Sequence, residues 1–186
     1  METIRSFISF DIDDEQVLRN LSKVQRALLE TGADLKIVEP ENIHVTVKFL
    51  GDIQPSIVDR IHEEMKKIAF TPFNIKIKGL GAFPNLRRMM VAWAGIEEGA
   101  EELKDVYNQL ESNFRVLGFK PEPRGFSPHL TIARVRTGRS KNELAKVIEQ
   151  MAGYEFGVIK AKCLRLKKSV LTPKGPIYTL LKEVCH

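Results

Sequence analysis

The chain has 186 residues, 43% of them hydrophobic, which suits one domain, or two small interlocked lobes, around a real core. Its formal net charge of +5 at pH 7 favours an acidic partner such as nucleic acid or a phosphorylated small molecule, and no stretch approaches the roughly 20 apolar residues that a membrane span needs. Acidic residues directly follow the short apolar run of the N-terminus, which argues against a signal peptide, and we expect a soluble cytoplasmic protein that works as a monomer.

The first half of the chain predicts alternating strands and helices. Strands are indicated by β-forming residues of alternating polarity, and helices by apolar residues at intervals of three or four. Asp13 or Asp14 can cap the first helix. The predicted order is a strand over 5–12, a helix with Val17, Leu21, Val24 and Leu28 that stops near Gly32, a strand over 42–51, a helix opened by Pro55 with Val58, Ile61, Met65 and Ile68, and strands over 73–83 and 89–96.

The second half predicts a similar series. Ser140 and Glu143 match a capping box, whereas Cys163 and Cys185 have no metal-ligand spacing, and two cysteines do not make a disulfide framework. The predicted order is a helix with Leu103, Val106, Leu110 and Phe114 that ends near Gly118, a proline-rich loop over 120–128, a strand over 129–135, a helix with Leu144, Val147 and Met151 that ends at Gly153, and strands over 155–166 and 175–184.

The order of these elements repeats, which predicts a duplicated chain. Strand, helix, strand, helix, strand, strand occurs twice, and one strand serves both copies. Two histidines in corresponding strands, His44 and His129, are 129 − 44 = 85 residues apart. We therefore predict a single bilobal domain over residues 1–186, built from two interlocked repeats of about 4–96 and 89–184 and related by a pseudo-twofold axis.

The corresponding strands carry the same short motif. Residues 44–49 read HVTVKF and residues 129–134 read HLTIAR, so each has a histidine with a threonine two positions later. Side chains alternate between the faces of a strand, so each histidine shares a face with its threonine. Across a pseudo-twofold axis the two motifs would meet and place two imidazoles and two hydroxyls in one cleft.

This set of groups suits phosphoester chemistry without a metal. Imidazole titrates near neutral pH, so one of His44 and His129 can act as general base while the other acts as general acid. The hydroxyls of Thr46 and Thr131 can bind the non-bridging oxygens of a phosphate. The residues alone do not say which histidine is the acid and which is the base.

Two basic residues follow the motifs closely, and either could balance the charge of a phosphate. Strand alternation puts Lys48 on the face of His44. Arg134 comes five residues after His129, so the same alternation turns it away from the histidine unless a bulge or a strand end re-aims it.

Other interpretations of these residues are weaker. A single His-x-Thr on a strand is usually structural, but two copies at equivalent places in a duplicated chain rarely arise by accident. Two histidines could bind zinc, but no third ligand sits at a recognisable spacing. His62 lies on a predicted helix surface, His186 ends the chain, and Ser127 lacks the context of a serine nucleophile.

With these motifs the chain resembles the two-histidine phosphoesterase superfamily, and within it the LigT-like RNA 2′,3′-cyclic phosphodiesterases, formerly called 2′-5′ RNA ligases. The segments RSFISFDI (5–12) and GAFPNLRRMMVAWAGI (81–96) share the resemblance, while Ser127 stands before the proline where some members have an arginine. The resemblance implies an α+β fold, bilobal and duplicated, in which two antiparallel sheets face a central cleft and the helices lie outside.

The resemblance also implies a reaction and the roles of the site residues. A terminal RNA 2′,3′-cyclic phosphate would open to a 2′-phosphate without metal or other cofactor. His44 would protonate the leaving 3′ oxygen, and His129 would take the proton from water. Thr46, Thr131 and Arg134 would bind the phosphate.

Two alternatives stay open. If an RNA 5′-hydroxyl replaces water, the same site would join RNA ends by a 2′-5′ linkage, and the resemblance includes such ligation of tRNA halves. A module that binds RNA ends and turns nothing over is the other alternative. Each hypothesis has the same partner, an RNA with a 2′,3′-cyclic phosphate end such as a tRNA fragment, and none involves a membrane.

Overall fold

Nine β-strands and four α-helices make up the computed structural model, which describes every residue from Met1 to His186. The strands are β1 (Ile4–Asp11), β2 (Leu35–Ile37), β3 (His44–Ile53), β4 (Phe73–Pro84), β5 (Met89–Glu98), β6 (Leu130–Val135), β7 (Glu155–Ala161), β8 (Cys163–Thr172) and β9 (Gly175–Cys185). The α-helices are α1 (Glu15–Glu30), α2 (Val58–Lys66), α3 (Ala100–Phe114) and α4 (Lys141–Gln150). Three short 3-10 turns are η1 (Pro40–Asn42), η2 (Pro55–Ile57) and η3 (Arg115–Leu117).

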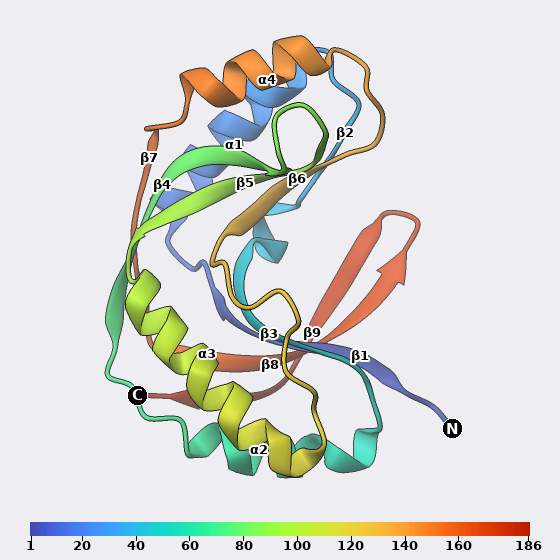
Figure 1. Cartoon of the computed structure of the whole chain (residues 1–186), viewed down its shortest axis with the longest axis vertical. Helices are drawn as coiled ribbons and strands as arrows, with labels where there is room; N and C mark the ends of the chain where they lie inside the picture. The colour runs from blue at the N-terminus through green and yellow to red at the C-terminus, as the bar shows by residue number, and fades with distance from the viewer.

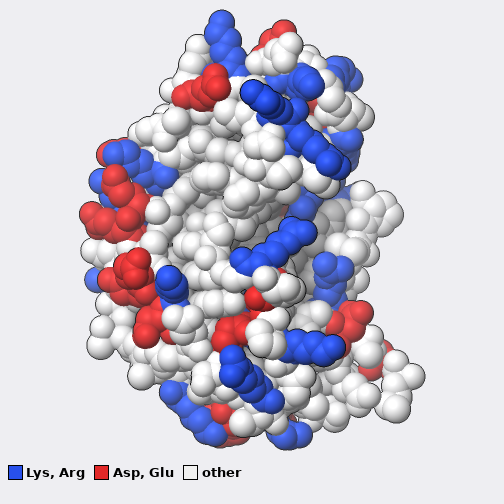
Figure 2. Space-filling model, viewed as in Figure 1, with Lys and Arg blue, Asp and Glu red and all other residues white.

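The strands form two sheets in which every neighbouring pair is antiparallel. The first sheet has the order β3-β1-β8-β9, and the second has the order β2-β6-β5-β4-β7. Helices α2 and α3 pack beside the first sheet, and α1 and α4 beside the second (Figure 1). Figure 2 shows a hollow in the surface between these two parts, with basic side chains at its edge. The predicted bilobal α+β fold is confirmed.

The two halves of the chain are exchanged between the sheets. The first sheet takes β1 and β3 from the first half and β8 and β9 from the second. Helix α1 packs against β6 and β7 of the second sheet, whereas α3 packs against β3 of the first. Neither lobe is therefore built from one half of the sequence.

The predicted helix faces supply much of the core. Asp14, one of the two candidate caps, accepts a 2.8 Å hydrogen bond from the backbone N–H of Val17 and so begins α1, since an acidic side chain satisfies the free donors of a first turn. The buried residues predicted from helical spacing are Val17, Leu21, Val24, Leu28, Ile61, Met65, Ile68, Leu103, Val106, Leu110, Phe114 and Leu144. They belong to one contiguous cluster of buried apolar residues that includes both lobes.

The single strand predicted over 155–166 is wrong. The predicted strand is interrupted at Lys162 and forms two strands, β7 and β8. Strand β7 pairs with β4 in the second sheet, whereas β8 pairs with β1 in the first. Alternating polarity continues through this interruption, so no residue pattern in the sequence marks the end of one strand and the start of the next. The crossing between lobes follows from which strands need partners, and that is a tertiary property. The short edge strand β2 also lacks a sequence signal and was not predicted.

The predicted capping box at Ser140 and Glu143 is also wrong. Ser140 has a left-handed backbone with φ of 54°, and its side chain makes no hydrogen bond to the first turn of α4. Its hydroxyl instead faces Gly32, where an added Cβ would come within 3.2 Å of it. Contact with the end of α1 therefore overrides the local capping pattern.

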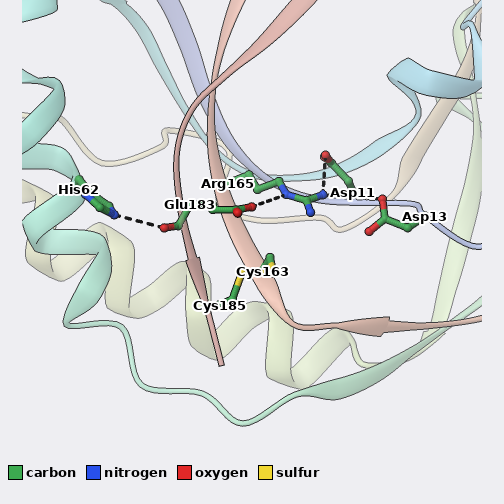
Figure 3. Close-up of a disulfide and its surroundings, with 7 residues drawn as sticks. All are labelled: Asp11, Asp13, His62, Cys163, Arg165, Glu183 and Cys185. Atoms are coloured by element: carbon green, nitrogen blue, oxygen red, sulfur yellow. Dashed lines mark hydrogen bonds and ion pairs between the residues drawn. A yellow bond between two sulfur atoms is a disulfide. The ribbon is translucent and has the colours of Figure 1, made fainter.

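Cys163 and Cys185 form a disulfide, a pairing that was not predicted from the sequence (Figure 3). The two residues are cross-strand partners at the start of β8 and the end of β9. They are 22 residues apart in the chain, and a hairpin register is what brings two such positions together.

No helix combines the length and the apolar character that crossing a membrane requires.

Candidate active site

The two His-x-Thr motifs lie on strands of different sheets that approach each other. His44 is the first residue of β3, and His129 immediately precedes β6. Thr46 pairs with Ser9 on β1, and Thr131 pairs with Trp93 on β5. Strands β3 and β6 contact each other, and the charge of His129 influences the pKa of His44. The structure therefore brings the two motifs together.

The two imidazole rings are fixed in the same way. Nδ1 of His44 lies 2.7 Å from the carbonyl oxygen of Asn42, and Nδ1 of His129 lies 2.7 Å from that of Ser127. A carbonyl oxygen can only accept, so each Nδ1 carries a hydrogen. Each Nε2 is therefore the atom that can hold or release a proton in the site. Nε2 of His44 lies 2.8 Å from the hydroxyl oxygen of Thr46.

Aromatic side chains hold both rings, and the sequence patterns did not single them out. Phe7 of β1 stacks on His44 with ring centroids 4.8 Å apart, and Tyr178 of β9 meets the same ring edge-on at 5.4 Å. Phe83 of β4 meets His129 edge-on at 4.9 Å. Such contacts restrict ring rotation, and a ring of fixed orientation makes a better acid or base.

Both histidines are easier to deprotonate than an ordinary histidine. Burial lowers the pKa of His44 from 6.5 to about 4, and the nearby charge of Lys167 acts in the same direction, while the hydrogen bond to Asn42 and the charge of Asp11 oppose them. Burial also lowers the pKa of His129, and its hydrogen bond to Ser127 acts in the opposite direction. The neutral imidazoles are thus favoured until an anion enters the site.

Arg134 faces the site because β6 contains a β-bulge. Thr131 pairs with Trp93 and Arg134 pairs with Val91, so one extra residue of β6 lies between these pairs. Trp93 and Val91 share a face of β5, and their partners Thr131 and Arg134 therefore share a face as well. The β-bulge that is needed to turn Arg134 toward the face of Thr131 is therefore present. Burial raises the pKa of Tyr178, and the positive charge of Arg134 partly opposes this shift, so Arg134 lies near that residue.

Lys48 does not face the site, and the prediction from strand alternation is wrong. A bulge in β3 pairs Lys48 with Ile8, although Thr46 pairs with Ser9. Ile8 is fully buried, and Lys48 is only 4% exposed. The Lys48 ammonium forms an ion pair with Glu111 of α3. The bulge has therefore turned this lysine toward the helix layer.

Phe49 takes the position that alternation assigned to Lys48. It pairs with Phe7, the residue that stacks on His44, so it lies on the same face of the first sheet. Its side chain is 63% exposed, so the ring is accessible on that face. In the second motif the same place, 85 residues later, belongs to Arg134.

A second set of charged residues lies beside His44. Asp11 pairs with His44 across β1 and β3, and its carboxylate accepts hydrogen bonds from Lys167 and, at 2.9 Å, from Arg165. Arg165 also contacts Glu183 at 3.1 Å (Figure 3). These contacts lower the pKa of Asp11 against the effect of burial. Lys167, not Lys48, is thus the lysine near His44.

The histidines are not part of a ready set of metal ligands. Cys163, Glu183 and Cys185 are the one group of three or more histidine, cysteine or acidic side chains whose ligand atoms lie within 4.8 Å of one another. Two of these residues are joined in the disulfide. His44 and His129 belong to no group of three such ligand atoms within 4.8 Å of one another, so the arrangement suits acid–base chemistry better than metal coordination.

Comparison with known proteins gives consistent results over the whole chain. The family described as LigT like Phosphoesterase matches residues 12–93 and 95–178. An RNA 2′,3′-cyclic phosphodiesterase of Aeropyrum pernix is 38% identical over 164 residues, covering 88% of this chain and 93% of the relative. The protein of the same name from Methanothermobacter thermautotrophicus is 39% identical over 178 residues, covering 95% of each chain.

Solved structures share the same fold. A crystal structure of a Thermus thermophilus protein superposes with a TM-score of 0.79 at 25% identity, over 98% of this chain and 97% of that one. Escherichia coli LigT without ligand superposes with a TM-score of 0.80 at 20% identity, over 100% of this chain and 98% of that one. The family match in two consecutive segments also agrees with a duplicated fold.

Proposed function

Because the chain belongs to the LigT-like phosphoesterase family, we propose that it hydrolyses RNA 2′,3′-cyclic phosphate ends to 2′-phosphomonoesters. The observation that carries this proposal is the paired geometry of His44 and His129. Both rings bind a backbone carbonyl oxygen through Nδ1, which leaves both Nε2 atoms for the reaction. Relatives that match at 37–39% identity over most of this chain are RNA 2′,3′-cyclic phosphodiesterases.

The proposed reaction needs one proton acceptor and one proton donor. His129 takes a proton from water, and the water oxygen forms a bond to phosphorus. The bond between phosphorus and the 3′ oxygen breaks, and His44 gives its proton to that oxygen. The products are a 3′-hydroxyl and a 2′-phosphate, and the two histidines have exchanged protonation states. A proton returned through solvent restores the starting state.

The phosphate oxygens would be bound by residues of both motifs. Thr46 and Thr131 offer hydroxyl donors, and Arg134 offers a guanidinium on the same face of β6 as Thr131. Lys48 is not included, because it is buried in its ion pair with Glu111. A bound anion also favours protonated imidazole, so substrate itself would raise the lowered pKa of His44 toward the value that a proton donor needs.

Phe49 supplies a candidate site for the terminal nucleobase. Its exposed ring lies on the cleft face of the first sheet, beside the proposed phosphate site. Aromatic side chains stack on RNA bases largely without regard to sequence, and each stack contributes about 1–3 kcal/mol to binding. This arrangement fits an enzyme that acts on RNA ends of different sequence.

The test is incubation with an RNA oligonucleotide that ends in a 2′,3′-cyclic phosphate, in the presence of EDTA and across a range of pH. We expect a 2′-phosphate product, and kcat/KM should be highest on the acidic side of pH 6.5, since both histidines have lowered pKa values. His44→Ala and His129→Ala should each reduce kcat by about 10²–10⁴-fold. His62→Ala, on α2, is the matched control.

The outcomes separate the hypotheses. Near wild-type rates in both single variants at the motif histidines would rule out the acid–base mechanism. Tight binding without any product would favour an RNA-end binding module, and activity only after addition of a metal would replace this mechanism with a metal-dependent one. Joined RNA in the presence of excess 5′-hydroxyl ends would reveal the ligase reaction.

A further inference from the structure

Beyond the two motifs, the cleft face of the first sheet carries a row of hydrogen-bond donors. Arg5 of β1 pairs with Ser169 of β8, and Ser169 pairs with Tyr178 of β9. Cross-strand partners point to the same face of a sheet. That face is the one with the histidine, because Tyr178 contacts the rings of both Phe7 and His44.

None of these three side chains forms a hydrogen bond or an ion pair within the protein. Arg5 forms no ion pair. Asp52 lies opposite it on β3, but the two charges are not paired. By contrast, Arg165 and Lys167, the other two basic residues on this face of β1 and β8, are both bound to Asp11. Arg5 is therefore the free cation of this face.

Charges that act on Tyr178 connect the row of donors with the proposed reaction site. Burial raises the pKa of the Tyr178 hydroxyl, and the positive charges of Arg134 and Arg5 act in the opposite direction. The hydroxyl thus stays protonated at neutral pH and remains a donor. Arg134, which belongs to the motif of the second sheet, and Arg5 both lie close enough for their charges to act on this hydroxyl. A guanidinium and two hydroxyls without acceptors form a set that suits an anion.

We propose that Arg5, Ser169 and Tyr178 form a second anion subsite, which binds the internucleotide phosphate on the 5′ side of the terminal nucleotide. This proposal rests on the proposed function. In an RNA that ends in a 2′,3′-cyclic phosphate, the next phosphate is the one on the 5′ oxygen of the same nucleoside. The ring of Tyr178 is 5.4 Å from that of His44, and two strand spacings of about 4.8 Å separate the backbones of Tyr178 and Arg5. The row therefore leads away from the reacting phosphate over a length that suits one nucleotide.

The subsite makes the enzyme selective for RNA ends over free nucleoside 2′,3′-cyclic phosphates. A mononucleotide has no phosphate on its 5′ oxygen, so it cannot use the row. Asp52 would oppose an anion bound beside Arg5, which limits the affinity of the subsite. Removal of that charge should strengthen the preference for the longer substrate.

The test compares three substrates that share the same reacting group: adenosine 2′,3′-cyclic phosphate, a diadenosine with a phosphodiester linkage and the same cyclic end, and the same dinucleotide with an uncharged methylphosphonate linkage. Arg5→Gln should lower kcat/KM for the phosphodiester dinucleotide about 10-fold more than for the other two, since it removes a charge-assisted contact that only this substrate can make. Asp52→Asn should change the same ratio in the opposite direction. Arg60→Gln, an exposed arginine of α2, is the control.

Binding of the 2′-phosphorylated dinucleotide product, measured by calorimetry, keeps the subsite testable even without turnover. Arg5→Gln should weaken binding of the phosphodiester product. The difference in affinity between the phosphodiester and the methylphosphonate products should therefore become much smaller than in the wild type. Equal losses on all three substrates would place Arg5 at the reacting phosphate and overturn the subsite. An unchanged substrate ratio would overturn it too. Absence of turnover in the wild type, with the binding difference intact, would contradict the proposed reaction and not the subsite.

Discussion

His44 illustrates how packing sets the behaviour of one side chain. Its ring lies between Phe7 and Tyr178, with Nδ1 bound to the carbonyl oxygen of Asn42. Burial outweighs that hydrogen bond and lowers the pKa to about 4. The folded protein therefore favours the neutral ring, whereas the unfolded chain protonates it near pH 6.5.

This difference predicts an acid-sensitive contribution of His44 to the free energy of unfolding. Its folded-state pKa is lowered, so the contribution is fully present above about pH 6.5 and is lost as the pH falls toward 4. A shift from 6.5 to about 4 corresponds to about 3 kcal/mol. Urea unfolding at pH 7 and pH 4 should show a smaller loss of stability in His44→Gln than in the wild type. An equal loss would contradict the burial effect, and His62→Gln is the matched control.

At the scale of elements, two bulges decide which basic residue shares a face with the threonine of its motif. The bulge in β6 turns Arg134 to the face of Thr131, and the bulge in β3 turns Lys48 away from the face of Thr46. The two strands thus deviate from regular alternation at corresponding places. The outcome differs because the side chains at corresponding positions differ: Phe49 stands where the second motif has Arg134.

The bulges predict opposite effects for two substitutions of basic residues. Arg134→Gln should lower kcat/KM by about 10–100-fold with little change in stability, because it removes the proposed charged contact with the phosphate. Lys48→Met should leave kcat/KM nearly unchanged but lower the free energy of unfolding by about 3 kcal/mol, since it leaves the partly buried carboxylate of Glu111 without its cation. Only the hydrogen bond from the backbone N–H of Glu122, at 3.3 Å, would remain. Activity assays and urea unfolding of both variants check this.

A second substitution separates loss of the ion pair from loss of packing. Lys48→Met combined with Glu111→Leu should recover much of the stability, because no unpaired charge stays buried. The assignment of Lys48 to a structural role would be refuted if Lys48→Met lost activity at unchanged stability.

For the whole molecule, the exchange of strands and helices between lobes makes the halves interdependent. β1 lies between β3 of its own half and β8 of the other. Helix α1 covers the second sheet, and α3 covers the first. One contiguous apolar core includes both lobes, so separation of the halves would expose apolar surface from each.

Fragments 1–98 and 99–186, divided between β5 and α3, should therefore be unfolded when expressed alone and should fold when expressed together. Each fragment by itself lacks the partner strands and the covering helix of its sheet. Circular dichroism and urea unfolding of the separate and the combined fragments would measure this. A cooperative unfolding transition in either fragment alone would show that the repeats are independent units.

Much of this protein can be derived from local patterns in its sequence. The strands and helices, the buried helix faces and the doubled His-x-Thr motif all rest on periodicity over a few residues. Such patterns can be read from the sequence because side chains on the core face of a helix or strand are apolar and those on the solvent face are polar. His44 with Thr46, and His129 with Thr131, could for this reason be singled out as candidates before their positions in space were known.

Other features depend on contacts between segments far apart in the chain, and only the tertiary structure decided them. The break between β7 and β8, the Cys163–Cys185 disulfide and the opposite directions of Lys48 and Arg134 leave no local signal. A bulge reverses the face of every later residue on its strand, yet it is fixed by pairing with a neighbouring strand. Residue type and spacing thus determined which chemistry this chain can carry, and strand pairing determined which side chains reach it.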